Sequence, residues 1–231
     1  EQIEVQLIKS KKKFAKAKVK KIIEPSKDRV VPKCAHYETC GGCIAQHVSV
    51  EAQTRSKFES FRQTLKRIGK VDLDATHFDL SWTGAAYGYR NRARLALAPG
   101  NTLGFRAQAS NNIVDVEVCP VLSPLAQQAL TDVRKQSFMV SEPCEIEVIT
   151  NDERALVGLP ENLRLPANNQ SSVVEYTHVS DSKTILANDG HGSLSLAPGV
   201  FAQSNAVGNA AMIEYIGSLL CESEHLIELY A

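Results

Sequence analysis

The sequence lacks any long apolar run, and no stretch of its 231 residues approaches the roughly 18 apolar residues of a membrane span. It also lacks the apolar core of a signal peptide, because its first residues are acidic and the following ones are rich in lysine. Its six cysteines are too few and too unevenly spaced for a secreted protein built on disulfides. We therefore expect a cytoplasmic protein without a membrane segment.

The chain has no net charge overall, because 26 Lys and Arg balance 26 Asp and Glu, but the charges are unevenly distributed. Residues 1–70 hold 17 basic and 7 acidic residues, a net charge of +10, so residues 71–231 carry a net charge of −10. A basic front part joined to an acidic remainder favours a polyanion partner at one end. A solvated lysine face is the alternative interpretation.

Three cysteines stand close together in a C-x5-C-x2-C pattern, Cys34, Cys40 and Cys43, and Cys119 follows far downstream before a proline. Two glycines separate Cys40 from Cys43. Glycine permits the positive φ angles with which a tight turn wraps its N–H groups around a bound group. Four thiolates can hold either a [4Fe–4S] cluster or one zinc ion. The spacing therefore predicts a metal centre, with ordinary thiols as the alternative.

Alternating patterns over residues 3–8 and 14–23 predict a β-hairpin with one apolar face and one lysine face. Because an isolated two-stranded hairpin is only marginally stable in water, we expect it to belong to a small β-barrel whose opening strands are not in this sequence. Lysines on such a barrel contact phosphates without reading the base sequence. The lysines expected to do so are Lys16, Lys18 and Lys20.

Residues 50–68 are expected to form an amphipathic helix that Ser49 caps and Gly69 stops. The basic outer face of this helix has two interpretations, contact with RNA or simple exposure to solvent. Residues 87–118 predict three short antiparallel strands, the third of which leads into Cys119. Alternation in the first of them places three arginines on one face, for which we favour phosphate contact: Arg90, Arg92 and Arg94.

The remainder predicts an α+β domain with a largely antiparallel sheet. A second helix begins at Ser123 and Pro124 and runs to about Ser137, with four apolar residues facing inward: Leu125, Ala129, Leu130 and Val133. Strands are expected at residues 145–150, 155–159, 173–178 and 184–187, and a surface loop near residues 161–170. A helix at residues 206–221 and an apolar strand at residues 225–231 are typical of the entry into a doubly wound nucleotide-binding sheet.

Five separated motifs occur in a fixed order along the chain. They are C-x5-C-G-G-C followed by Gln46-His47, Gly88-Tyr89-Arg90-Asn91-Arg92, Ile113-Val114-Asp115 leading to Cys119-Pro120, Phe201-Ala202-Gln203-Ser204-Asn205, and Ile227-Glu228-Leu229-Tyr230. Together they resemble the iron–sulfur branch of the RNA (uracil-5-)-methyltransferase family, which acts on 23S rRNA or tRNA. The resemblance covers essentially the whole chain, and its specificity comes from the shared order of the motifs.

The resemblance implies three domains. Residues 1–26 are similar to part of a TRAM domain, a small β-barrel of oligonucleotide-binding type, and residues 27–198 to a central iron–sulfur, RNA-binding domain. Residues 199–231 resemble the start of a Rossmann-like class I methyltransferase domain, on which the helix at residues 50–69 is a candidate to pack. The implied cluster ligands are Cys34, Cys40, Cys43 and Cys119, and the implied S-adenosylmethionine contacts are Gln203 and Tyr230.

The reaction of the family implies a cysteine that adds to C6 of uracil and a glutamate base that removes the C5 proton. Both are expected beyond residue 231, so we expect a chain truncated at both ends, with an incomplete S-adenosylmethionine site and no activity by itself. Cys144 and Cys221 are assigned to structure. The expected partner is RNA, 23S rRNA in preference to tRNA, and the expected state is a monomer.

A second hypothesis is a stand-alone RNA-binding module with a four-cysteine zinc site, although C-x5-C is longer than the spacing typical of zinc folds. A radical S-adenosylmethionine enzyme is disfavoured, because Cys119 closes the iron position that such enzymes leave open. We expect a structural cluster, because methyl transfer from a sulfonium involves no electron transfer. Four aromatic residues are candidates to stack on a base or to lie in the core: Tyr87, Tyr89, Phe105 and Phe201.

Overall fold

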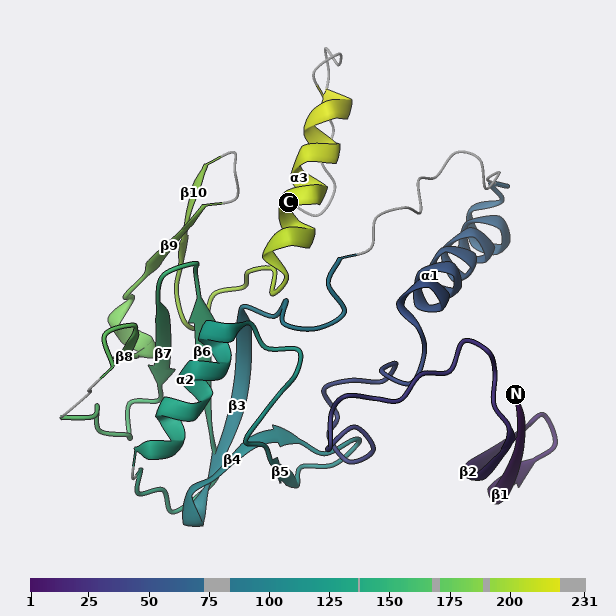
Figure 1. Cartoon of the computed structure of the whole chain (residues 1–231), viewed down its shortest axis with the longest axis horizontal. Coiled ribbons are helices and arrows are strands. Elements are labelled where there is room, and N and C mark those ends of the chain that lie inside the picture. Colours follow the sequence, from purple (N-terminus) through teal and green to yellow (C-terminus); the bar gives the residue numbers. More distant parts are fainter. Residues whose placement is uncertain (73–83, 137, 168–170, 189–191, 221–231) are drawn as a thin grey trace. The chain divides into compact units, whose positions relative to one another are not determined.

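The computed structural model describes residues 1–72, 84–136, 138–167, 171–188 and 192–220 (Figure 1). The chain divides into two compact units. The first unit comprises Glu1–Lys33 and Ala45–Thr83, and the second comprises Cys34–Ile44 and Gly84–Ala231. The domain limits predicted at residues 26 and 198 divide the chain differently and stay predictions.

The first unit contains the predicted hairpin, in which β1 (Gln2–Lys11) pairs antiparallel with β2 (Phe14–Glu24). Val5 stands opposite Val19 and Leu7 opposite Ala17, so apolar side chains share one face. That face is open, because Val5 is 43% exposed and Leu7 65%. Among the described residues the two strands pair only with each other, so the hairpin is confirmed and the barrel stays a prediction.

The predicted helix of the first unit is α1 (Val50–Thr64), and the Ser49 hydroxyl caps it by accepting the Ala52 N–H at 3.3 Å. A π-helical turn, Leu65–Gly69, extends the helix. The predicted stop at Gly69 is wrong by one residue, since Lys70 takes the left-handed conformation at φ 58° and its N–H reaches the Leu65 carbonyl. The wider π turn adds one residue before the chain can leave the helix.

The second unit is built on a six-stranded sheet with the order β5-β4-β3-β6-β7-β8. Its strands are β3 (Arg92–Ala98), β4 (Thr102–Arg106), β5 (Ile113–Asp115), β6 (Cys144–Thr150), β7 (Ala155–Leu159) and β8 (Val174–His178). All neighbours pair antiparallel except β7 and β8, which are parallel. The predicted strands and their largely antiparallel arrangement are therefore confirmed.

One face of this sheet is covered by α2 (Pro124–Lys135), which lies along β6, β7 and β8 (Figure 1). Ser123 caps the helix as predicted, by accepting the Ala126 N–H. The buried positions of the helix are Ala126, Ala129, Leu130 and Val133. Leu125 is only half-buried, because the helix turns its neighbour Ala126 toward the sheet. The predicted helix end at Ser137 lies outside the described residues.

The opposite face carries a smaller core, formed by Ile149, Leu156, Ile185 and Leu196. The last two belong to a hairpin of β9 (Ile185–Asn188) and β10 (Ser193–Leu196). The sequence did not predict β10, because four residues are too short to show a period. The predicted last helix is α3 (Ala206–Leu220), and Asn205 caps it by accepting the Gly208 N–H at 3.0 Å.

The strand predicted at residues 225–231 and the predicted helix end at Cys221 lie outside the described residues. In the described part of the chain, no helix is both long and apolar enough to cross a membrane.

Candidate functional site

The cysteine loop, residues 34–43, is fixed to the end of β4. Cys40 forms an antiparallel bridge with Ala107, and the Gly41 N–H donates to the Arg106 carbonyl at 2.9 Å. A Cβ on Gly41 would lie 3.0 Å from that carbonyl oxygen, so this close backbone approach favours glycine. The Gly42 N–H donates to Cys40 Sγ at 3.4 Å. Neither Gly41 nor Gly42 has a positive φ angle, so that part of the expectation is wrong. Gly41 is favoured by the close backbone approach, and the Gly42 N–H faces the Cys40 sulfur.

The fourth cysteine, Cys119, follows β5 in the same unit. Its N–H donates to Gln127 Oε1 on α2 at 2.9 Å, and its carbonyl accepts the Leu122 N–H at 3.1 Å. All four cysteines are half-buried and lie outside any disulfide. The backbone at Cys119 is thus fixed by the start of α2, and the cysteine loop by the end of β4.

The thiols lie close enough to influence one another. Burial raises the pKa of the Cys40 and Cys119 thiols, and the neighbouring Cys34 and Cys43 raise it further. In the described ranges, however, no group of three or more His, Cys, Asp or Glu side chains is arranged so that it could hold a metal ion. Charge effects act over longer distances than a metal–sulfur bond of about 2.3 Å, so the two observations are compatible. The four-thiol donor set fits a cluster or zinc, and the metal centre stays a prediction.

Of the three predicted arginines, Arg92 and Arg94 lie on β3 and Arg90 precedes it, and their surroundings differ. The Arg92 side chain is 10% exposed, and both its Nε and its Nη2 lie 2.7 Å from Glu147 Oε1 on β6. The Arg94 side chain is 66% exposed, with Nε 3.7 Å from the same oxygen. Arg90 is half-buried and its backbone bridges to Leu122 and Asn205. The RNA-binding role of all three stays a prediction, and their geometry favours Arg94.

Arg94 also lines a hollow of about 340 Å³ beside the cysteine loop. The other polar side chains that line it are Arg106, Gln108 and Glu145, and Arg106 lies 3.5 Å from Glu145. Sequence reasoning missed Arg106 and Gln108. Arg106 shares the sheet face of Arg94 across the β3–β4 pair, but a single arginine at a strand end gives no pattern to detect. Two arginines and one glutamate leave this hollow with an excess of positive charge.

The predicted lysines lie on β2 in the first unit, and all three are exposed. The strand pairing places Lys16 and Lys18 on one face. Lys20 falls at an irregularity of the pairing, and its Nζ lies 2.7 Å from Glu4 Oε1. The phosphate-binding role of these lysines stays a prediction, and Glu4 partly offsets the charge of Lys20.

The segment that holds Gln203 alternates between the protein and solvent. Ala202 packs against the smaller core, and the Ser204 carbonyl accepts the Asn91 N–H at 2.8 Å. Gln203 is exposed between them, and Phe201 is 83% exposed. Of the four candidate stacking residues, Phe201 is the exposed one, whereas Phe105 packs against the main core and Tyr87 and Tyr89 are half-buried. Tyr230 lies outside the described residues.

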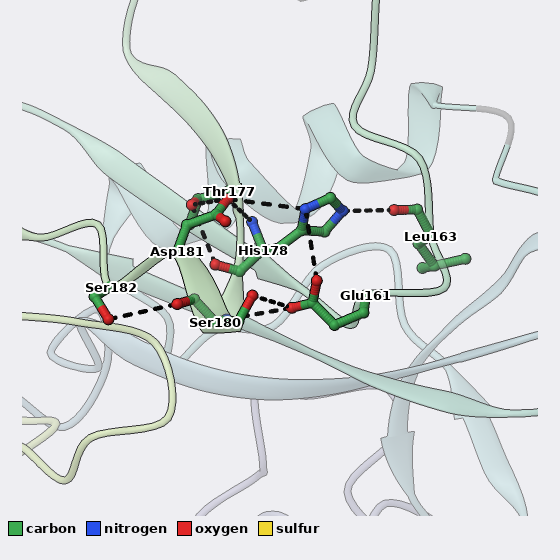
Figure 2. A network of polar contacts seen from close by, with 7 residues as sticks. All are labelled: Glu161, Leu163, Thr177, His178, Ser180, Asp181 and Ser182. Atoms are coloured by element: carbon green, nitrogen blue, oxygen red, sulfur yellow. Dashed lines mark hydrogen bonds and ion pairs between the residues drawn. The ribbon is translucent and has the colours of Figure 1, made fainter.

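A separate polar cluster lies at the end of β8 (Figure 2). His178 Nε2 donates to the Leu163 carbonyl at 2.9 Å, and Nδ1 lies 3.9 Å from Glu161 Oε2 and 3.8 Å from Asp181 Oδ2. The Ser180 hydroxyl donates to Glu161 at 2.5 Å. The members contact one another and close the loop before β8 onto the turn after it, so we assign the cluster to structure.

No protein-family model matches the chain. The curated 23S rRNA (uracil(1939)-C(5))-methyltransferase RlmD of Pectobacterium atrosepticum is 30% identical in an alignment that covers 92% of this chain and 52% of that protein. The RlmD of Cronobacter sakazakii is 42% identical over 139 residues, which cover 58% of this chain and 30% of that protein. The chain thus spans about half, or less, of the length of these relatives.

Among solved structures, the fold is similar to the crystal structure of the Pyrococcus abyssi tRNA (uracil-54, C5)-methyltransferase in complex with S-adenosyl-L-homocysteine. The TM-score is 0.61 at 19% identity, and the match covers 93% of this chain and 57% of that one. At this identity the likeness shows the fold.

Proposed function

This chain is related to the RNA (uracil-5-)-methyltransferases, and on that premise we propose that it forms the RNA-binding and cofactor-facing part of an enzyme that methylates C5 of a uridine in 23S rRNA. The observation that carries the proposal is the likeness to a 23S rRNA methyltransferase over 92% of the chain. The methyl donor is S-adenosylmethionine, which accords with the S-adenosyl-L-homocysteine bound to the tRNA methyltransferase of similar fold. The proposed location is the cytoplasm and the proposed state a monomer.

RNA binding is assigned to cations on regular strands. Arg94 and Arg106 line one hollow of the second unit, and Lys16 and Lys18 share a face of the hairpin. Such cations contact phosphates and position the RNA without reading its sequence. The exposed Phe201 offers an aromatic ring on which an unpaired base can stack. Gln203, two residues on, offers an amide donor and acceptor to S-adenosylmethionine.

The metal centre is proposed to be a [4Fe–4S] cluster on Cys34, Cys40, Cys43 and Cys119. When bound, the cluster supplies a cross-link between the cysteine loop and the segment after β5. Support comes from the presence of all four thiols in one unit and from the close backbone approach at Gly41. Burial, and to a lesser extent the neighbouring Cys34 and Cys43, raise the pKa of the Cys40 and Cys119 thiols. Elemental analysis for iron, sulfide and zinc distinguishes this proposal from a zinc-binding module.

Cys144 is not a candidate for the nucleophile. Burial raises the pKa of its thiol, and it packs against the main core. A nucleophilic cysteine needs an accessible thiolate with a lowered pKa. Cys144 therefore keeps the structural role that the sequence assigned to it.

Titration of the chain with transcripts of 23S rRNA and tRNA, at several salt concentrations, tests the RNA-binding proposal. We expect tighter binding of the 23S rRNA transcript. We expect Arg94→Ala to weaken binding and to reduce the slope of log K against log salt by about 1, because one phosphate contact is lost. Glu145→Gln is the matched control and is expected not to weaken binding. Failure of the wild-type chain to bind either RNA would contradict the proposal.

A further inference from the structure

A buried carboxylate joins the arginine face of the sheet to the segment that holds Gln203. The Glu147 side chain, on β6, is 8% exposed. Its Oε1 accepts from Arg92, and its Oε2 accepts the backbone N–H of Gly199 at 2.5 Å. The two carboxylate oxygens therefore contact two different parts of the chain, one in the sheet and one in the loop after β10.

We propose that Glu147 is a positioning residue that fixes the tethered segment, residues 197–205, and with it the place of Gln203 in the S-adenosylmethionine pocket. Its importance for the cofactor rests on the proposed function. Its effect on the segment rests only on contacts within this chain. Neither Glu147 nor Gly199 belongs to the motifs that indicate the family.

The other anchors of the tethered segment are apolar or made by the backbone. Pro198 is buried over Gly158 of β7, where an added Cβ would lie 2.4 Å from the Pro198 Cβ. At the far end the Ser204 carbonyl accepts the Asn91 N–H. Glu147 is thus the charged anchor at the front end, and Gln203 lies between the two ends. Loss of this anchor releases Gly199, while Pro198 stays packed on β7 and Ser204 stays held.

Charge makes the Glu147 anchor stiff. A hydrogen bond from a backbone N–H to an ionised carboxylate is shorter and about twice as strong as one between neutral groups. Arg92 pairs with this buried carboxylate through two donors, Nε and Nη2, which both face Oε1. Arg94 reaches the same oxygen from the solvent side at 3.7 Å. The carboxylate therefore stands between the exposed arginine and the tethered segment.

The test is nuclear magnetic resonance on the full chain. The main variant combines Arg92→Met with Glu147→Met, which leaves no buried charge unpaired and so preserves the fold. We expect amide exchange at Gly199 to rise about tenfold or more, from loss of a charge-assisted bond. The decisive readout is the order parameter of residues 201–203, expected to fall from about 0.85 to below about 0.6.

Glu145→Gln is the matched control, because Glu145 lies two residues earlier on the same face of β6 and its side chain is 56% exposed. It is expected to leave the order parameters unchanged. Unchanged order parameters in the double variant would overturn the proposal. If the double variant does not fold, the test uses Glu147→Asp, which keeps the charge but has a shorter side chain. Lower order parameters at residues 201–203 in Glu147→Asp would support the proposal, and unchanged order parameters would overturn it.

The cofactor part has a separate readout. In the protein that contains this chain and a complete cofactor site, we expect Glu147→Asp to raise KM for S-adenosylmethionine more than it lowers kcat. If kcat fell by as large a factor as KM rose, while the order parameters changed, the link between Glu147 and the cofactor would be overturned. A wild-type protein without any methyl transfer would refute the proposed function, whereas the order parameters of residues 201–203 would still decide the role of Glu147.

Discussion

Replacement of Gly158 by alanine is expected to destabilise the second unit by displacing Pro198. An added Cβ would lie 2.4 Å from Pro198 Cβ and 2.8 Å from its Cγ, both under the 3.0 Å that real Cβ atoms keep. The strand cannot retreat, because its neighbours Val157 and Leu159 are fully buried. Pro198 must therefore move, and the tethered segment moves with it.

The size of the effect follows from two opposing contributions. Overpacking a well-filled site costs about 1–3 kcal/mol. Alanine regains about 0.5–1 kcal/mol over glycine within a strand, because glycine loses more backbone freedom on folding. The net expectation is a loss of up to about 2.5 kcal/mol in the free energy of unfolding, which corresponds to a fall in Tm of up to about 10 °C for a protein of this size.

Urea denaturation, followed by circular dichroism, measures the change. Gly217→Ala on α3 is the control, since an added Cβ there meets nothing within 4 Å, and it is expected to be neutral or stabilising by up to about 1 kcal/mol. A Gly158→Ala protein more stable than the wild type would refute the reasoning, because Pro198 could not then lie against β7.

Two further predictions concern buried polar contacts. Arg92→Ala is expected to lower the free energy of unfolding by about 3–5 kcal/mol, because Glu147 would be left buried without its charge partner. Arg94→Ala, on the exposed side, should change it by less than about 1 kcal/mol. Equal losses of stability for the two variants in urea denaturation would contradict this difference. Tyr176, whose hydroxyl donates to Asp132 at 2.7 Å, has its pKa raised by burial and by that carboxylate. A raised pKa contributes stability below the unfolded value of about 10 that is lost as pH rises above it, so we expect stability to fall above about pH 10. The fall should be shallower in Tyr176→Phe, and an equal pH dependence in both proteins would contradict the role of Tyr176.

Local patterns accounted for most elements of the fold. Alternation predicted the hairpin and the strands of the main sheet, and Ser49 and Ser123 marked the starts of α1 and α2. The failures were also local. A π-helical turn moved the end of the first helix to Lys70, and β10 was too short to recognise.

The partners of the predicted site residues depended on the order of the strands. Arg92 and Glu147 lie 55 positions apart and meet only because β3 and β6 are neighbours. No spacing rule reveals that pair, so sequence reasoning assigned Arg92 to phosphate and did not consider Glu147. The contact between Gly158 and Pro198 could not be predicted from the sequence either. A glycine within a strand can mark a bulge, a bend or a close approach, and the sequence does not tell which of these applies.

The cysteines show both the reach and the limit of pattern reasoning. Their spacing predicted that Cys119 joins the other three in one centre. The structure places all four in the second unit, where burial first, and the neighbouring Cys34 and Cys43 second, raise the pKa of Cys40 and Cys119. The arrangement of the thiols within the described residues does not by itself define a metal site. Spacing identifies the donors, whereas the final arrangement depends on the group they bind.

The central claim is tested most directly by nucleoside mass spectrometry of 23S rRNA from a strain deleted for the gene that contains this chain. We predict that one C5-methyluridine disappears from 23S rRNA while the C5-methyluridine of tRNA remains. The intact gene should restore the modification, and the gene with Gln203→Ala should restore less of it. An unchanged content of C5-methyluridine in the 23S rRNA of the deletion strain would contradict the account.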